Sequence, residues 1–284
     1  MSDQSKATGY FLVAPALILM LVILGFPALA SVLESFGVWG QGSFGLGAYK
    51  RLVDDPEFLA AFWNTAVFVI VVVSLHLVIG MSVALLLNMD TKLRWLFRVI
   101  AILPWTMPDI IGGLIFRFIF DTLKGGMNAV LTSLGSGNVI DWLGRPDLAL
   151  GTVISAEAWR GYPYVMLILL AGMQAIPKDQ YEAASIDGVG AWKSFIYITL
   201  PNLKPMIWLA VVLDSVWECR LFGMIYGMTG GGPGYSTETL SLMVYKNYFQ
   251  FYNTAYASSI AVVLAAVLLV LAVPYVRLSL GDRE

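Results

Sequence analysis

Residues 182–205 read EAASIDGVGAWKSFIYITLPNLKP, a polar segment between two long apolar runs. The stretch Glu182–Ile186 suits a short helix, because Ala and Glu are good helix formers. Gly188 and Gly190 supply turn chemistry, since glycine accepts a positive φ at little cost. The apolar side chains of residues 192–200 predict a segment along a membrane surface, and the two prolines that follow mark the entry to the next apolar run. The stretch therefore predicts a helix–turn–helix that projects from a membrane protein.

The composition of the whole chain is that of an integral membrane protein. Of its 284 residues, 58% are hydrophobic and 13% charged, and the mean hydropathy is +0.77. A soluble domain carries about 25% charged residues. The net charge of −2 does not indicate a nucleic-acid partner. The single cysteine, Cys219, excludes an intrachain disulfide. The single histidine, His76, stands in an apolar run, where packing or a helix–helix hydrogen bond is favoured over a metal-ligand role, and there is no Cys/His cluster to hold a metal.

Apolar runs predict the number of membrane-spanning helices. A bilayer core of about 30 Å needs about 20 mostly apolar residues per helix, and this rule gives about six spans. They cover residues 10–33, 63–87, 97–119, 151–175, 205–227 and 256–279. Spanning segments must satisfy their backbone hydrogen bonds internally, so we expect an all-α integral membrane bundle. No internal repeat or linker is visible, and we expect a single transmembrane domain over residues 1–284.

The positive charges in short loops predict the orientation. The loops after the second and fourth spans and the two termini carry Lys92, Arg94, Arg98, Lys178, Lys193, Lys204, Lys6, Arg277 and Arg283. This bias places both termini and the loop of residues 177–205 in the cytoplasm. One alternative is a signal-peptidase site at Ala28–Ala30, after the first apolar run. Cleavage there would remove one span, and the remaining spans would no longer place the positively charged loops and the C-terminus as the charge bias requires.

The stretch of residues 182–205 resembles the EAA loop of ABC-transporter permeases, the cytoplasmic element that docks onto the ATPase subunit. The resemblance rests on Glu182–Ala184, Asp187–Gly188, Phe195 and the Leu-Pro pair at 200–201, all at the family spacing. One departure is Val189, where the family usually has a smaller residue. The resemblance implies that the following residues couple the chain to its ATPase: Glu182, Ala183, Ala184, Asp187 and Gly188.

A second motif, Thr-Gly-Gly-Gly-Pro at residues 229–233 followed by Ser236-Thr237, is similar to a segment of carbohydrate-type permeases. It resembles in particular the first permease subunit of maltose and glycerol-3-phosphate importers, and implies that residues 228–245 form a periplasmic loop. The alternative is an ordinary flexible loop. It is not a phosphate loop, because no lysine follows the glycines. Matches at Asn64-Thr65 and Trp159-Arg160 agree with the same family.

Ionisable residues within the spans indicate where a solute passes, because each costs about 3 kcal/mol on insertion scales. Asp109 falls in the middle of the third predicted span. Asp214 and Glu218 share a face of the fifth, beside Trp217. Acidic groups accept hydrogen bonds from sugar hydroxyls, and an aromatic face packs against the C–H side of the ring. Arg220 either pairs with Glu218 or meets an anionic group of the solute. These five residues form the predicted substrate pathway.

The sequence therefore predicts a permease subunit, not an enzyme, of an ATP-driven importer for a sugar or sugar derivative in a bacterial or archaeal inner membrane. The resemblance implies a heterodimer with a second permease, two ATPase subunits that bind ATP and magnesium, and a periplasmic solute-binding protein. The chain itself is expected to hold no cofactor. An ion-coupled secondary carrier is the alternative, with Asp109, Asp214 and Glu218 as proton or cation sites. A membrane enzyme would need a nucleophile–base set or metal cluster that is not visible.

Overall fold

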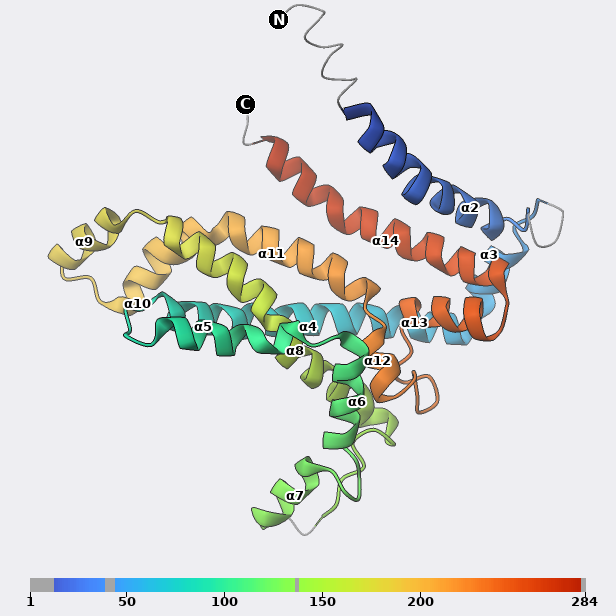
Figure 1. The fold of residues 1–284 in the computed structure, drawn as a ribbon, viewed down its shortest axis with the longest axis horizontal. Helices are drawn as coiled ribbons and strands as arrows, with labels where there is room; N and C mark the ends of the chain where they lie inside the picture. The colour runs from blue at the N-terminus through green and yellow to red at the C-terminus, as the bar shows by residue number, and fades with distance from the viewer. Residues whose placement is uncertain (1–12, 39–43, 136–137, 282–284) are drawn as a thin grey trace, which may run out of the picture. The chain divides into compact units, whose positions relative to one another are not determined.

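The computed structural model describes residues 13–38, 44–135 and 138–281, with side chains up to residue 273. Lys6, Arg283, the side chain of Arg277 and the start of the first predicted span lie outside this description. Every regular element in the described ranges is a helix. The elements are η1 Leu21–Gly25, α2 Phe26–Ser35, α3 Gly47–Asp54, α4 Pro56–Asn88, α5 Arg94–Ile102, η2 Leu103–Thr106, α6 Asp109–Ile119, α7 Gly126–Ser133, α8 Pro146–Ala175, α9 Lys178–Ile186, α10 Ala191–Ser194, η3 Phe195–Thr199, α11 Leu200–Arg220, α12 Gly223–Met228, α13 Leu240–Tyr245, η4 Lys246–Gln250 and α14 Thr254–Gly281 (Figure 1).

The first, second and sixth predicted spans coincide with long apolar helices, and the total number of spans depends on how two other segments are counted. Four helices are long and apolar enough to cross a membrane: Val13–Ser35, Pro56–Asn88, Ala191–Arg220 and Thr254–Val273. A bent pair, Arg94–Thr106 with Asp109–Ile119, makes a fifth if it is one span. The 30-residue helix α8 covers the predicted span 151–175 but is not among the apolar helices. The predicted number of about six is therefore approximate.

The contacts divide the chain into two compact units, and they do not test the prediction of one domain. The first unit comprises residues 1–58 and 243–265, and the second comprises residues 59–242 and 266–284. Within the first unit, Thr254 Oγ1 donates to Glu34 Oε1 at 2.6 Å. All the residues proposed from the sequence as functional belong to the second unit.

The third predicted span, residues 97–119, is not one continuous helix. The chain bends by 94° between Thr106 and Asp109. Met107 is extended, with ψ of 126°, because the proline ring at position 108 disfavours the helical conformation for the residue before it. Asp109 lies directly after this bend, as the first residue of α6, and not within a continuous helix.

The fifth span also differs from its prediction. The helix–turn–helix is present, formed by α9, a turn at Gly188 with φ of +72°, and α10. Residues 192–200, however, do not form a separate surface segment, because one helix runs from Ala191 to Arg220. The π-helical turn η3 lies near its start, and the predicted entry prolines lie inside the helix. The helix ends at Arg220, since the next residue is extended, instead of continuing to residue 227.

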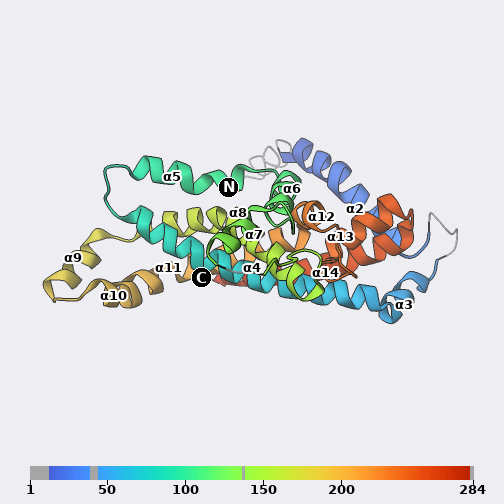
Figure 2. The ribbon, with the colours of Figure 1, turned by 90° about the horizontal axis from the view of Figure 1, so that it is seen from below.

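The second unit is held together by a core between α4, α5, α8 and α11. This core is formed by Ala84, Leu87, Ala101, Val165, Met166, Leu169, Leu170, Met173, Ile176, Leu203 and Ala210. Helices α6 and α12 approach closely at Gly113, where an added Cβ would lie 2.6 Å from the carbonyl oxygen of Met224. Small residues at such crossings let membrane helices pack backbone to backbone. Figures 1 and 2 both show α9 and α10 at the end of this unit where α5 begins.

Helix α4 presents an apolar stripe to its surroundings. Its most exposed apolar side chains recur every seven or eight residues, at Trp63, Ile70, Val78 and Leu86. This spacing places them on one face of the helix. In water such a face would be unfavourable, so it is suited to lipid or to another membrane-spanning subunit.

Candidate functional site: a buried charge cluster

A buried histidine joins three helices of the second unit. His76 of α4 is fully buried, and its Nδ1 lies 2.9 Å from Asp214 Oδ2 on α11. Its Nε2 lies 3.2 Å from the carbonyl oxygen of Glu157 on α8. Helix α8 comes this close because residue 161 is glycine, and an added Cβ would collide with the imidazole ring. The predicted helix–helix hydrogen bond of His76 is therefore confirmed.

The hydrogen bonds of His76 constrain the charge of its pair with Asp214. The carbonyl of Glu157 can only accept, so Nε2 carries a hydrogen. The contact between Nδ1 and the Asp214 carboxyl needs one further proton, on either partner. The histidine and the aspartate together therefore carry no net charge.

A buried arginine binds two carboxylates. Arg160 Nε and Nη2 donate to the two oxygens of Glu157, at 3.0 Å and 2.6 Å, in the bidentate geometry that makes such pairs strong. Its Nη1 lies 2.8 Å from Asp109 Oδ1 at the start of α6. Arg160 and Glu157 are buried, whereas Asp109 is 39% exposed. Arg160 of α8 therefore holds the start of α6, directly after the bend between η2 and α6.

Glu218 is the carboxylate of this cluster that lacks a compensating partner. It lies one turn after Asp214 and is 2% exposed. Its Oε2 has no hydrogen-bond partner among the described residues. A ligand atom of Glu218 lies within 4.8 Å of one from His76 and one from Asp214. An unpaired buried carboxylate is costly, so Glu218 favours a proton, a cation or a hydroxyl donor beside it.

The donor set His76, Asp214 and Glu218 does not suit a resident metal ion. A histidine binds a metal through a ring nitrogen lone pair. Both ring nitrogens of His76 are already used, by Asp214 and by the Glu157 carbonyl. A metal would have to break one of these hydrogen bonds. A hydroxyl group, by contrast, can donate to Glu218 Oε2 without disturbing either.

An aromatic wall stands beside the charged groups. The ring of Tyr164 stacks on Trp105, with centroids 5.9 Å apart, and on Trp217, with centroids 6.2 Å apart. These rings and the polar groups line a hollow of about 10 Å³, which is the volume that one water molecule needs. Sites for small organic ligands have volumes of about 300–1,000 Å³. A sugar ring therefore needs these helices to separate before it can lie between Glu218 and the rings.

The structure brings together four of the five residues of the predicted substrate pathway. Asp109, Asp214, Trp217 and Glu218 all belong to the cluster or its wall. Arg220 is exposed and does not line the hollow. Its guanidinium lies 5.9 Å from the centroid of the Trp217 ring. In the described part of the chain it makes no ion pair with Glu218, so the first of its two alternative roles is not observed. A role of these residues in transport stays a prediction.

Three members of the cluster were not among the predicted pathway residues: His76, Glu157 and Arg160. Their contacts join residues more than 50 positions apart, except for Glu157 with Arg160. A signal was present, because Glu157 and Arg160 stand three apart inside the fourth apolar run, and charges in such runs are rare. Their partners, however, depend on how the helices pack.

The predicted coupling residues lie on an exposed knob formed by α9 and α10. Glu182, Ala183, Asp187 and Gly188 are exposed, and Ala184 is half-buried. The knob also exposes two large apolar side chains, Ile186 at 86% and Trp192 at 73%. Tyr181 Oη lies 2.9 Å from Thr199 Oγ1, which ties α9 to the long helix that contains η3. The knob is thus a fixed projection with an apolar surface that suits a protein partner.

The glycine-rich loop after α12 is held in one conformation. Gly230 and Gly231 have φ of +61° and +93°, which favours glycine at both positions. Thr229 Oγ1 and Thr237 Oγ1 lie 2.7 Å apart across the turn. Asn64 of α4 donates to two carbonyl oxygens of the loop, those of Tyr235 and Glu238. These bonds argue against the alternative of a flexible loop.

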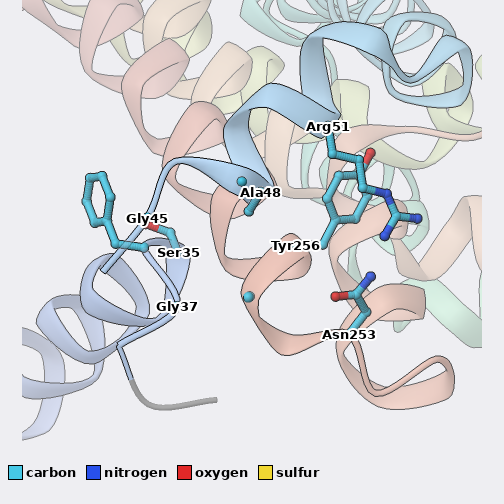
Figure 3. Close-up of a pocket in the computed structure, with 10 residues that line it drawn as sticks. Ser35, Gly37, Gly45, Ala48, Arg51, Asn253 and Tyr256 are labelled. Carbon is cyan, nitrogen blue, oxygen red and sulfur yellow. The ribbon is translucent and has the colours of Figure 1, made fainter. Parts of the chain in front are cut away.

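The first unit contains a separate hollow of about 380 Å³, shown in Figure 3. Ser35, Gly45, Ala48, Arg51 and Tyr256 are among the residues that line it. The Arg51 guanidinium lies 4.4 Å from the centroid of the Tyr256 ring. Arg51, the cation that lines this hollow, therefore already contacts an aromatic ring. None of the residues proposed from the sequence as functional lines it.

Comparison with protein families gives one match over most of the chain. The family model described as binding-protein-dependent transport system inner membrane component matches residues 76–280.

Relatives of known name cover nearly the whole chain. The sulfoquinovosyl glycerol transport system permease of Agrobacterium fabrum is 35% identical over 96% of this chain and 90% of its own. The trehalose/maltose transport system permease of Thermococcus litoralis is 34% identical over 97% and 95%. The lactose transport system permease of Rhizobium radiobacter is 36% identical over 93% and 91%.

A solved structure has the same fold. The chain is similar to one from a bacterial ABC transporter involved in the import of the acidic polysaccharide alginate, with a TM-score of 0.85 and 21% identity. The similarity covers 99% of this chain and 98% of the other.

Proposed function

This chain belongs to the family of inner membrane components of binding-protein-dependent transport systems, and on that premise we propose that it is the permease subunit of an ATP-driven sugar importer. The relatives described above are named for glycosides or disaccharides, which share a polyhydroxylated surface. Family membership supports this function over the ion-coupled carrier, because the matching proteins are permeases of transport systems. The solute class is therefore a sugar or a glycoside.

The observation that carries the proposal is the exposed knob of α9 and α10. It combines acidic residues, a glycine turn and the exposed apolar side chains of Ile186 and Trp192. A membrane protein gains nothing from exposing such side chains at a tip, whereas a partner protein can cover them. We assign this partner as an ATPase subunit and place the knob and both termini on the cytoplasmic side. The complete assembly contains a second permease, two ATPases and a periplasmic solute-binding protein.

In this assembly the buried charge cluster belongs to the solute pathway. Hydroxyl groups of the solute donate to Glu218 Oε2, and the stacked rings of Trp105, Tyr164 and Trp217 pack against the C–H face of the sugar. The hollow at this position holds about one water molecule, so passage requires helices α8 and α11 to separate. ATP binding and hydrolysis shift the equilibrium between the closed and open arrangements, because the nucleotide-bound ATPases have different affinities for the two states of the permease.

The test is purification of the tagged chain from detergent-solubilised native membranes, with identification of the proteins that copurify. We expect a second permease and an ATPase, and ATPase activity that rises when the solute-loaded binding protein is added. The variant Gly188→Arg, with an unmodified second permease, is expected to keep the permease partner and retain less ATPase. A folded chain that purifies alone would count against the importer. Normal solute-stimulated activity in the Gly188→Arg variant would count against the knob as the docking element.

A further inference from the structure

Two guanidinium groups converge on one neutral amide where α5 begins. When the Gln174 amide is oriented to satisfy its hydrogen bonds, its oxygen accepts from Arg94 Nη2 at 3.1 Å and from Arg98 Nη2 at 2.8 Å. The Nε atoms of both arginines are buried and have no hydrogen-bond partner among the described residues. Asp90 lies 3.6 Å from Arg94 but is 97% exposed, so it compensates little of this charge.

The two arginines line a hollow of about 330 Å³ together with Lys178, the first residue of α9. Three cations and one carboxylate therefore face the same space, which leaves an excess of positive charge. Each arginine retains Nη hydrogens besides the one that it donates to Gln174, and guanidinium hydrogens match the oxygens of a phosphate group. The chemistry of this hollow is that of a site for a phosphate-type anion.

A second hollow lies next to the first. Arg98 and Gln174 line both, and the second has a volume of about 210 Å³. Its other lining residues are apolar and include Met166, Leu167 and Leu170 of α8. A charged hollow and an apolar hollow are thus neighbours on either side of Arg98 and Gln174. A soluble phosphate would use only the charged end, whereas a phospholipid would use both.

The surface around the hollows is suited to lipid. Helix α5, which carries both arginines, exposes Trp95, Phe97 and Ile100, each at least 49% accessible. Arg94 and Arg98 share one face of the helix, with Trp95 on one flank of that face and Phe97 and Ile100 on the other, so apolar side chains flank the cationic face of α5. Cationic pockets between membrane helices on the cytoplasmic side bind the head groups of anionic lipids. The positive charges of this loop favour the cytoplasmic side.

We propose that these neighbouring hollows bind one anionic phospholipid, with its phosphate group between Arg94, Arg98 and Lys178 and an acyl chain along Leu167 and Leu170. Because Lys178 begins α9, the bound lipid links the coupling knob to α5. The lipid thereby holds the knob in position. This last step rests on the proposed role of the knob, whereas the binding of lipid does not.

The binding test uses the protein, with whatever subunits copurify, incorporated into nanodiscs of phosphatidylcholine with or without phosphatidylglycerol. Native mass spectrometry then counts retained phosphatidylglycerol. We expect about one molecule per chain, and a loss of at least about tenfold in Arg98→Gln, since a charged hydrogen-bonding partner of the phosphate is removed. The matched control is Lys92→Gln, which removes a charge from the same loop outside the hollow and should retain the lipid.

Two further arms separate lipid from free anion. Ala171 is exposed and lines the apolar hollow, so Ala171→Trp fills the acyl end without changing charge. We expect this variant to lose phosphatidylglycerol, and millimolar inorganic phosphate to leave the lipid count of the unmodified protein unchanged. Equal lipid counts in the unmodified protein and Arg98→Gln would overturn the proposal. Displacement by inorganic phosphate, with full retention in Ala171→Trp, would overturn the lipid as occupant.

The link to the knob has its own readout. Where the ATPase copurifies, solute-stimulated activity is expected to rise with phosphatidylglycerol in the unmodified protein and in Lys92→Gln. It should not rise in Arg98→Gln. A lipid count that falls in Arg98→Gln while stimulation stays normal would retain the site and overturn its effect on the knob. Loss of activity in every lipid and every variant would instead count against the proposed importer.

Discussion

The Nδ1 atom of His76 lies 2.9 Å from Oδ2 of Asp214, across 138 positions of sequence. This contact ties α4 to α11 one helical turn before Glu218. Because both ring nitrogens of the histidine are used, its side chain also fixes the backbone of α8. The three helices around the proposed pathway therefore meet at one imidazole.

Removal of this imidazole should destabilise the fold. The change His76→Ala leaves Asp214 buried without its partner, and we expect a loss of about 3 kcal/mol, as for other broken buried pairs. His76→Gln should cost less, because its amide still donates one hydrogen bond. Thermal unfolding in detergent measures both changes. The control is Ser82→Ala on the same helix, whose hydroxyl bonds only its own backbone. Equal midpoints for His76→Ala and Ser82→Ala would contradict the role of the contact.

Glu218 should matter more for transport than for folding. Glu218→Gln keeps the shape of the side chain and removes a buried charge that lacks a partner, so thermal stability should be retained. Solute uptake should fall by about tenfold or more, since a hydrogen bond to a charged group contributes about 1.5–3 kcal/mol. Uptake kinetics in vesicles provide the measurement. Asp147→Asn, an exposed carboxylate at the start of α8, is the control and should transport normally. Uptake that is unchanged in Glu218→Gln would remove this residue from the pathway.

Two glycines of α8 should respond in opposite directions to the same change. At Gly161 an added Cβ would meet the ring of His76, whereas at Gly151 it would meet nothing within 4 Å. We expect Gly161→Ala to destabilise by about 1–3 kcal/mol, as overpacking does. Gly151→Ala should stabilise by about 0.5–1 kcal/mol through its helix propensity. The thermal unfolding midpoints of the two variants in detergent measure these changes in stability. Similar shifts in both would show that α8 does not pack against His76 as described.

The turn of the knob formed by α9 and α10 contains two glycines that can be compared in the same way. Gly188 has φ of +72°, Gly190 has φ of −71°, and an added Cβ meets nothing within 4 Å at either position. Gly188→Ala should therefore cost about 1–2 kcal/mol of local conformational energy, whereas Gly190→Ala should not. We expect weaker ATPase copurification and lower solute-stimulated activity for Gly188→Ala alone. Equal activity in the two variants would mean that the left-handed turn is not needed for docking.

Local features of the fold were predictable because they depend on nearby residues. The spacing of Asp214 and Glu218 placed them on one helix face, and the glycine at 188 marked the turn of the knob. The apolar run that contains His76 predicted a helix–helix hydrogen bond, though not its partner. In each case the information lies within one or two helical turns.

The errors arose where the backbone departs from a regular helix. Pro108 breaks the third span and moves Asp109 to a helix start, where it meets Arg160. Pairing with Glu218 is one of the two roles that the sequence allows for Arg220, but Arg220 is the last residue of its helix and lies against Trp217. The contacts of Glu157 and His76 depend on the packing of distant helices. A pattern in a single sequence does not specify such packing.

The unbroken helix from Ala191 to Arg220 has a mechanical consequence. It begins in the turn of the knob and contains Glu218 near its other end. A helix of this length, about 45 Å, acts as a lever, and a tilt of about 5° at one end moves the other by about 4 Å. A small tilt that begins at the knob would therefore move the far end of the helix, near Glu218, by about the width of a water molecule.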